Sequence, residues 1–339
     1  MQVYFKKEKV KDLINALLAD NYTVFGPVKE KDKFFYRQLK KDQYPELESN
    51  SSLKPLNSLK EVCLPQTEVL FNYKYEDKQL IPDNLDKLAV PVVVFGAKPC
   101  DSDALKILDK VHTWDYKDEL YLEKRDKTIL ISLVCSEMNH PCFCTSVNGA
   151  PDSESGSDIM LSEIKDDKTG YIVKSVTSKG EDFLKKYKSV FSDVPANITP
   201  VTPIMNVAKQ DFSKVKEWLL KNFESDFWQN DTIKRCLGCG ICTFNCPTCH
   251  CFDIVDEASL KKGTRRKNWD ACMFPNFTKM FVHQPRPEPY RRWRQRLEHK
   301  FYYYPDKFEY TLCVGCGRCF SLCPVGIDIK ELVSNIQKL

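Results

Sequence analysis

Apolar side chains recur with two different periods over the first two hundred residues. At Val10, Leu13, Ile14, Leu17 and Leu18 they follow helical spacing, which predicts an amphipathic helix. The segments that predict strands, by continuous apolar runs or by β-prone residues, are 22–25, 33–39, 90–95, 128–134, 158–162 and 170–176. Helical patterns at 104–111 and 180–189 alternate with these strands. We therefore expect an α/β (or α+β) domain over residues 1–205.

The second half of the chain carries a different pattern. Turn-forming residues between 193 and 203 predict a linker. Beyond it, the segments 212–223, 253–261 and 288–301 look helical, and clear strand alternation is absent. We therefore expect residues 206–339 to form a mainly helical domain.

Two cysteine runs with one spacing lie within this second domain. The first is Cys236-Leu-Gly-Cys239-Gly-Ile-Cys242-Thr-Phe-Asn-Cys246-Pro247, and the second is Cys313-Val-Gly-Cys316-Gly-Arg-Cys319-Phe-Ser-Leu-Cys323-Pro324. Both read C-x2-C-x2-C-x3-C-P, the pattern that holds [4Fe–4S] clusters in bacterial ferredoxins. The glycines between the cysteines let the backbone turn tightly and approach the sulfurs. The runs therefore predict a helical two-cluster ferredoxin domain.

The fourth cysteine of such a run usually serves the other cluster. We therefore expect one cluster on Cys236, Cys239, Cys242 and Cys323. We expect the other on Cys313, Cys316, Cys319 and Cys246. Structural zinc is a weaker alternative, because it prefers two separate C-x2-C pairs. Disulfides are weaker still, because these cysteines are too crowded to pair cleanly.

Four further cysteines stand near predicted strand ends. Cys100 follows the strand at 90–95 and precedes a helix for which Asp101, Ser102 or Asp103 is the expected N-cap. Cys135 follows the strand at 128–134, and the pair Cys142 and Cys144 comes soon after. Ligands gather outside the carboxyl ends of parallel strands. These residues could hold a third [4Fe–4S] cluster or simply be buried thiols, and spacing alone favours neither.

For the remaining cysteines, packing is favoured over metal binding. Cys249, Cys251 and Cys272 could bind a further metal together with His250, but packing around the first cluster is the favoured interpretation. Cys63 has no cysteine neighbour in the sequence and is expected to be a small buried hydrophobic residue.

Charge is uneven although the net charge is only +4. Twelve Lys and Arg residues but only three acids lie between Lys261 and Lys300, with aromatic residues among them. Nearby cations would stabilise anionic clusters and could steer an acidic partner. A solvated face is the second interpretation of this basic segment. Nucleic-acid binding is the third, and we do not expect it because no recognised module accompanies the charge.

The chain also lacks certain signals. Residues 1–9 contain no apolar signal-peptide core, and the apolar run at 88–97 is too short to span a bilayer. We therefore expect a cytoplasmic protein, and an oxygen-poor cell suits so many thiolate-held clusters. The turn at Gly96 has no G-x-G-x-x-G pattern for a nucleotide cofactor.

Several longer motifs resemble a known family. They are Gly96-Ala-Lys-Pro-Cys100-Asp101, Cys142-Phe-Cys144, Cys246-Pro-Thr-Cys249-His-Cys251, Arg265-Arg-Lys-Asn-Trp269-Asp-Ala-Cys272 and the second cysteine run. The chain resembles the family of iron–sulfur subunits that is typified by the beta subunit of sulfhydrogenase and by the corresponding iron–sulfur subunit of anaerobic sulfite reductase. Where that family often has Gly-Gly-His, this chain reads Lys279-Met-Phe-Val-His283. The resemblance also favours the third cluster.

The resemblance implies a non-catalytic electron-transfer subunit. Its partners would be a flavoprotein that reacts with NAD(P)H and a catalytic subunit of the hydrogenase or sulfite reductase type. Two other classes stay open at this point. One is a redox enzyme with its own active site at the N-terminal cysteines, and the other is an iron–sulfur nucleic-acid-binding protein.

Overall fold

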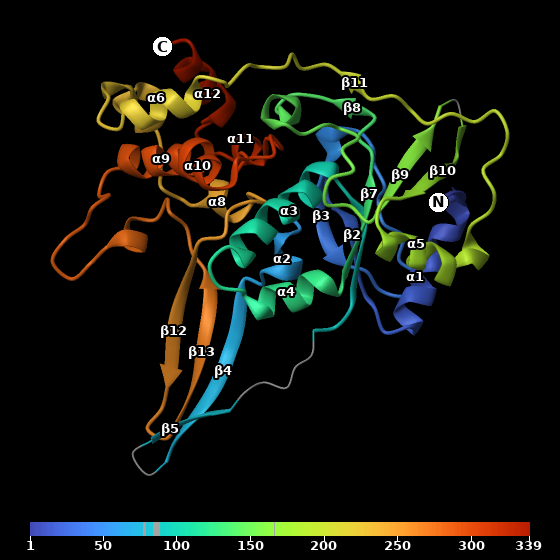
Figure 1. Ribbon diagram of the computed structural model, residues 1–339, viewed down its shortest axis with the longest axis horizontal. Coiled ribbons are helices and arrows are strands. Elements are labelled where there is room, and N and C mark those ends of the chain that lie inside the picture. The colour runs from blue at the N-terminus through green and yellow to red at the C-terminus, as the bar shows by residue number, and fades with distance from the viewer. Residues whose placement is uncertain (77–78, 84–88, 166) are drawn as a thin grey trace.

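The computed structural model describes residues 1–76, 79–83, 89–165 and 167–339. Its largest sheet has seven strands in the order β1-β10-β9-β7-β6-β2-β3 (Figure 1). Their bounds are β1 Gln2–Lys6, β2 Thr23–Glu30, β3 Lys33–Gln38, β6 Val92–Ala97, β7 Thr128–Leu133, β9 Ile159–Ile164 and β10 Asp167–Ser175. The central strands β2, β6, β7 and β9 are parallel, and the outer strands pair antiparallel. The α/β prediction is confirmed.

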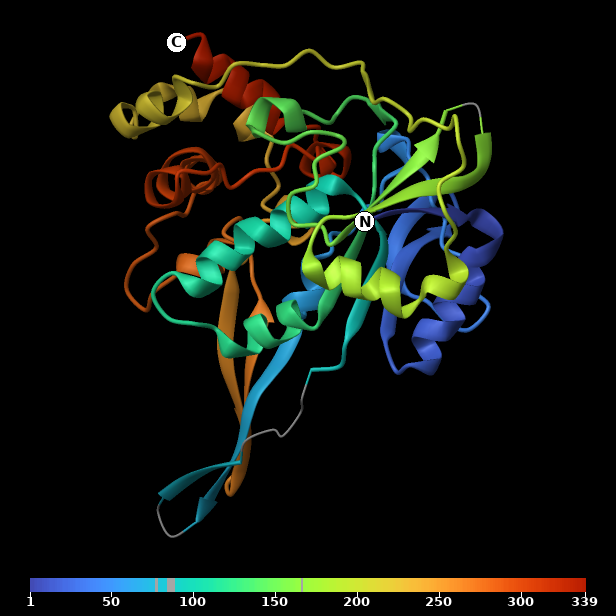
Figure 2. The ribbon, with the colours of Figure 1, turned by 45° about the vertical axis from the view of Figure 1, so that its right-hand side comes forward.

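Helices cover both faces of this sheet, as the two views in Figures 1 and 2 show. One face packs against α1 (Val10–Ala19) and α5 (Ser178–Lys186). The other packs against α2 (Lys60–Cys63), α3 (Pro99–Thr113) and α4 (Glu119–Asp126). Successive residues of β6 point to opposite faces, so Phe95 joins the first core and Val94 the second. A continuous apolar strand is what such two-sided burial requires.

Helix α3 begins earlier than its sequence pattern indicated. Its N-cap is Lys98 and its first residue is Pro99, so the prediction of Asp101, Ser102 or Asp103 as N-cap was wrong. Proline is well suited to the first helical position, because the N–H it lacks would have no partner there. The earlier start places Cys100 in the first turn of the helix.

A second sheet of four strands forms an arm that extends away from the body in Figure 1. Its strands are β4 (Thr67–Glu76), β5 (Gln79–Asp83), β12 (Phe252–Ala258) and β13 (Lys262–Trp269), in the order β12-β13-β4-β5. The prediction of a helix over 253–261 was therefore wrong. Strand β13 pairs with β4 from the first half of the chain, and this remote partner leaves no local signal in the sequence.

The rest of the second half is helical, as predicted. Its helices are α6 Val215–Lys221, α7 Asp231–Lys234, α8 Ile241–Phe244, α9 Pro289–Glu298, the π-helix His299–Tyr303, α10 Tyr304–Phe308, α11 Arg318–Ser321 and α12 Ile329–Gln337. Trp228, Trp293 and Leu297 lie in their common core. Within the described ranges, none of the helices combines the length and apolar character needed to cross a membrane.

The helical part packs directly on the α/β part. Ala104 and Ile107 of α3 share a small core with Tyr304, Leu312 and Val314. A short parallel pair, β8 (Glu137–Met138) with β11 (Ile204–Met205), joins the end of the expected linker to the loop after β7. The domain boundary near residue 205 stays a prediction. The four-stranded sheet and the small core shared with α3 both contain residues from the two sides of that boundary.

Candidate metal centres

The two cysteine runs adopt the same local backbone. Gly238 and Gly240 have φ values of +65° and +73°, and Gly315 and Gly317 have +62° and +73°. Side chains other than hydrogen are strained in this left-handed region, so the glycines are needed for the loop to curl. A one-turn helix then follows in each run, α8 in the first and α11 in the second.

The first group of cysteines comes from both runs. Cys236, Cys239 and Cys242 line one pocket of about 320 Å³ together with Cys323. The N–H of Gly238 donates to Cys236 Sγ at 3.4 Å, as expected where a loop wraps a cluster. The structure therefore brings together the four residues that the crossed arrangement requires.

The second group lies deeper in the protein. Burial, followed by the effect of neighbouring groups that include Cys246, raises the pKa of Cys313 to about 11 and also raises the pKa of Cys316 and Cys319. Cys246 is thus an electrostatic neighbour of all three cysteines of the second run. Burial disfavours a bare thiolate, so a bound cationic core is what would stabilise these sulfurs as anions.

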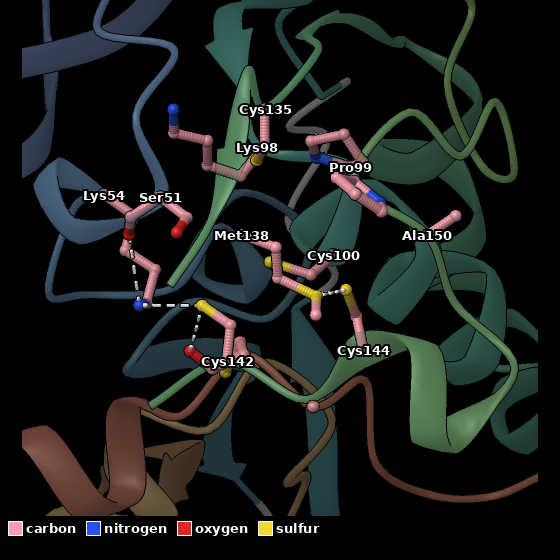
Figure 3. Close-up of a pocket in the computed structure, with 13 residues that line it drawn as sticks. Ser51, Lys54, Lys98, Pro99, Cys100, Cys135, Met138, Cys142, Cys144 and Ala150 are labelled. Carbon is pink, nitrogen blue, oxygen red and sulfur yellow. Dashed lines mark hydrogen bonds between the residues drawn. The ribbon is translucent and has the colours of Figure 1, made fainter. Parts of the chain in front are cut away.

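The third group lines a pocket of about 360 Å³ (Figure 3). Cys100 comes from the first turn of α3 and Cys135 from the residues just after β7, while Cys142 and Cys144 lie in the loop after β8. Burial, followed by the charge of Cys142, raises the pKa of Cys144 to about 12. All four sequence-predicted residues therefore meet at the carboxyl ends of β6 and β7, where spacing alone could not decide between a site and scattered thiols.

Two lysines and the second run complete the walls of this third pocket. Lys54 Nζ donates to Cys142 Sγ at 3.3 Å, and Lys98 also lines the space. Cys316, a member of the second group, lines it as well. The third group thus lies directly beside the second group. Lys98 lies within the motif at 96–101 and Lys54 lies in no motif, and the sequence analysis gave neither lysine a role.

A buried ion pair locks the second run against α3. Arg318 donates to both carboxylate oxygens of Asp101, at 2.9 and 2.7 Å, and both side chains are fully buried. Asp101 also accepts from the Tyr36 hydroxyl at 3.0 Å. Because Asp101 follows Cys100 and Arg318 lies between Cys316 and Cys319, this pair fixes the second and third groups relative to each other.

Comparison with known proteins agrees with this geometry. A family model described as a 4Fe-4S dicluster domain matches residues 235–327, which contain both cysteine runs. Sulfhydrogenase 2 subunit beta from Pyrococcus furiosus is 31% identical over 256 residues, covering 73% of this chain and 74% of that protein. The chain belongs to this family of iron–sulfur subunits. It is an electron-transfer subunit with a domain for two [4Fe–4S] clusters. No solved structure matches it significantly.

The basic segment of this family member divides into two parts. On the arm, Arg265 pairs with Asp256 and Arg266 pairs with Glu257 at the surface. On α9 and the π-helix after it, all of the cations except Arg291 are buried instead. Arg296 Nη1 donates to Cys249 Sγ at 3.4 Å, and Lys300 Nζ donates to Cys246 Sγ at 3.3 Å. These contacts favour cluster support for the buried half of the segment.

Two further observations from the sequence can be compared with the structure, namely the lone Cys63 and the departure from the family at 279–283. Cys63 is fully buried in the core beneath α2, where burial raises the pKa of its thiol to about 11, so its prediction as a buried hydrophobic residue is confirmed. The departure from the family at 279–283 lies in a loop before α9. Its residues Met280, Phe281 and Val282 are all exposed.

Single-ion binding does not describe the cysteine groups. Among the residues that the structure describes, no three His, Cys, Asp or Glu side chains converge closely enough for one metal ion. Each of the four irons of a cubane binds its own thiolate. The cysteine sulfurs that hold a cubane therefore surround a space, whereas the ligands of a single ion converge on one point. The four cysteines that line each of these two pockets fit that arrangement.

Proposed function

We propose that this chain relays single electrons between a flavoprotein partner that reacts with NAD(P)H and a catalytic redox partner of the hydrogenase or sulfite reductase type. The dicluster domain supports the relay, and the relative's name supports a partner of the hydrogenase kind. One observation carries the proposal. It is the pocket in which Cys236, Cys239 and Cys242 face Cys323 of the other run.

The ligands of the two clusters are crossed between the runs. The first cluster is held by Cys236, Cys239, Cys242 and Cys323, and the second by Cys313, Cys316, Cys319 and Cys246. When bound, such clusters supply one-electron redox chemistry. The chain's own residues provide thiolates, direct backbone N–H groups at sulfur and exclude water. Cys239 is exposed, so the first cluster is the one that a partner can approach.

Single substitutions test the crossed arrangement. Cys246→Ser should weaken the second cluster and leave the first, whereas Cys323→Ser should do the reverse. The reduced protein, prepared without oxygen, would be examined by EPR, with iron counted per chain. Loss of the first cluster in Cys246→Ser, with the second intact, would show that each run holds its own cluster.

A third [4Fe–4S] cluster on Cys100, Cys135, Cys142 and Cys144 is part of this proposal. Its support is the shared pocket with Lys54 and Lys98, whose charges suit an anionic occupant. Cys135→Ala should lower the iron content by about four per chain, because a cubane holds four irons. Unchanged iron in a folded Cys135→Ala protein would remove the third cluster and leave the two-cluster relay untouched.

The partners can be identified by purification of the native complex without oxygen. Nickel in the complex would indicate a hydrogenase, and a sirohaem spectrum would indicate sulfite reduction. A flavin-containing partner is expected in either case. Recovery of the chain without any redox partner would count against the relay.

A redox enzyme with its own active site is the second candidate. The 360 Å³ pocket with four cysteines and two lysines is the observation that favours it. The isolated chain would then turn over a substrate with artificial electron donors. The relay predicts electron uptake by the isolated chain without turnover.

A further inference from the structure

Three cysteines outside the groups described so far line a separate pocket of about 240 Å³. Cys249 and Cys251 lie between α8 and β12, and Cys272 follows β13. The N–H of Asp270 donates to the carbonyl oxygen of Cys251 at 3.0 Å, which brings the two segments together. This pocket lies beside the second cysteine group, because the N–H of Cys249 donates to the carbonyl oxygen of Cys246 at 3.3 Å. The cysteines therefore line a pocket of their own, and Cys251 and Cys272 also belong to the core that contains Cys236 and Cys242 of the first group.

Two buried cations, Arg296 and Lys300, line this pocket, and a third, Lys60, contacts the carbonyl oxygen of Cys249. Lys60, Arg296 and Lys300 are 4%, 2% and 2% exposed. None of them forms an ion pair with a carboxylate among the residues that the structure describes. Buried charges are costly unless an opposite charge faces them. The sulfurs are the groups available to supply that charge.

Lys60, unlike Lys300, donates to no sulfur of the second group. Lys300 contacts Cys246 of the second group directly. Lys60 Nζ instead donates to the carbonyl oxygens of Thr243 and Cys249, at 3.1 and 3.0 Å, and lies 4.2 Å from the centre of the Trp269 ring. Its charged neighbours are Cys249 first, then Cys246 of the second group and Cys251. Negative charge on the sulfurs of the 240 Å³ pocket therefore adds to the charge that balances Lys60.

We propose that Cys249, Cys251 and Cys272 hold an additional iron–sulfur cluster, with His250 as its fourth ligand. The three thiolates around a cubane leave a net negative charge, which faces the buried cations. Three cysteines and one histidine line the pocket, which gives one ligand for each of the four irons of a cubane. The site is independent of the relay partners and of the third cysteine group.

The hydrogen bond of His250 suits a ligand role. Its Nδ1 lies 3.0 Å from the carbonyl oxygen of Thr248. A carbonyl can only accept, so Nδ1 carries the proton and Nε2 keeps its lone pair. Metal-binding histidines usually donate their other ring N–H in this way, which fixes the tautomer and the orientation of the ring. His250 also lines the pocket.

Metal analysis of the full chain, expressed and purified without oxygen, tests the site. Cys272→Ala should lose about four irons and about four sulfides per chain relative to the wild type. Cys63→Ala is the matched control, because Cys63 is also buried but lines none of the cysteine pockets described, and it should lose none. Zinc is measured in the same samples.

Additivity separates this site from the second cluster. Cys272→Ala combined with Cys246→Ser should lose about eight irons per chain, because two different cubanes are removed. Cys251→Ser replaces Cys272→Ala if that variant does not fold. The wild type itself provides a test without substitution. More than about twelve irons per chain requires this site in addition to the three other groups.

The contrary results are equally distinct. Unchanged iron in a folded Cys272→Ala protein would leave the three cysteines as packing residues. Loss of about one zinc in place of iron would make the site mononuclear. A double variant that loses no more iron than Cys246→Ser alone would assign these cysteines to the second cluster. Where neither variant folds and the wild type holds about twelve irons, loss of about four irons in Cys135→Ala would overturn the proposal, because the three other groups would then account for all of the iron. About eight irons or fewer in the wild type would overturn it directly.

Discussion

The two cysteine runs share one spacing, one set of left-handed glycines and one following turn of helix, yet they lie in opposite surroundings. In the first run Leu237 is 67% exposed and Cys239 is also exposed. At the equivalent positions of the second run Val314 is 3% exposed and Cys316 is buried. One motif thus produces a surface site and an interior site within the same domain.

The difference comes from what each loop packs against. A side chain at Gly238 would meet nothing closer than 3.4 Å, whereas one at Gly315 would come within 2.5 Å of the backbone at Phe143 and Cys144. Where the first run has the half-buried Ile241, the second has Arg318, fully buried against Asp101. The spacing therefore determines the ligand geometry, and the neighbouring chain determines burial. Burial and nearby charge in turn tune the potential of a cluster.

The largest effect is expected at the sixth position of the runs, where Arg318 replaces Ile241. Arg318→Ala should lower the free energy of unfolding by about 3–5 kcal/mol, because it leaves the Asp101 carboxylate buried without a cationic partner. Ile241→Ala should cost about 1–2 kcal/mol, since that side chain is only half-buried. Denaturant unfolding of cluster-loaded protein without oxygen measures both. Adding Asp101→Asn to Arg318→Ala should recover part of the loss, and equal costs for the two single variants would contradict the comparison.

A smaller difference is expected at the glycines. Both Gly315→Ala and Gly238→Ala introduce a side chain at positive φ, which costs about 1–2 kcal/mol. Gly315→Ala also forces the backbone at Phe143 and Cys144 to move, and such overpacking adds about 1–3 kcal/mol. The melting temperature of Gly315→Ala should therefore fall well below that of Gly238→Ala. Similar melting temperatures would mean that the second run does not pack on the Cys142–Cys144 loop.

The smallest change in stability is expected one residue earlier in each run. Val314→Ala removes buried methyl groups and should cost about 1–2 kcal/mol. Leu237→Ala should change the free energy of unfolding by less than about 0.5 kcal/mol, because the side chain is exposed. If the first cluster is where a partner docks, Leu237→Ala should nevertheless slow reduction by the native partner several-fold. Reduction by a small dye, followed by stopped flow, should be unchanged.

A final comparison of the two clusters uses substitutions at their cysteine ligands and none at packing residues. Exposure of Cys239 should make the first cluster lose its iron to air and a chelator several-fold faster than the second. Cys323→Ser and Cys246→Ser, which retain the second and the first cluster respectively, allow each decay to be followed alone by visible absorbance. Equal rates would show that the two sites are equally shielded from solvent.

Prediction from the sequence succeeded where the signal was local. The apolar runs at β6 and β7 and the periodicity of α1 predicted the α/β layer, because alternation and helical spacing reflect burial directly. The cysteine spacing predicted the dicluster domain, because the ligands of each run lie close together in the chain. Prediction failed at β12, where an exposed and charged segment became a strand only because β13 pairs with β4. The start of α3 was also missed, because proline at the first position was not weighed against the acidic residues that follow it.

The sequence by itself determined the two left-handed cysteine loops and the layered α/β body, since both depend on residues near one another in the chain. Only the tertiary structure decided that Cys100, Cys135, Cys142 and Cys144 share one pocket beside Cys316, and that Lys60 lies buried over Cys249. These groups come from segments far apart in the sequence, so their meeting depends on how the sheet, the arm and the helices pack. Burial and charge balance arise from that packing, and no local pattern of residues encodes them.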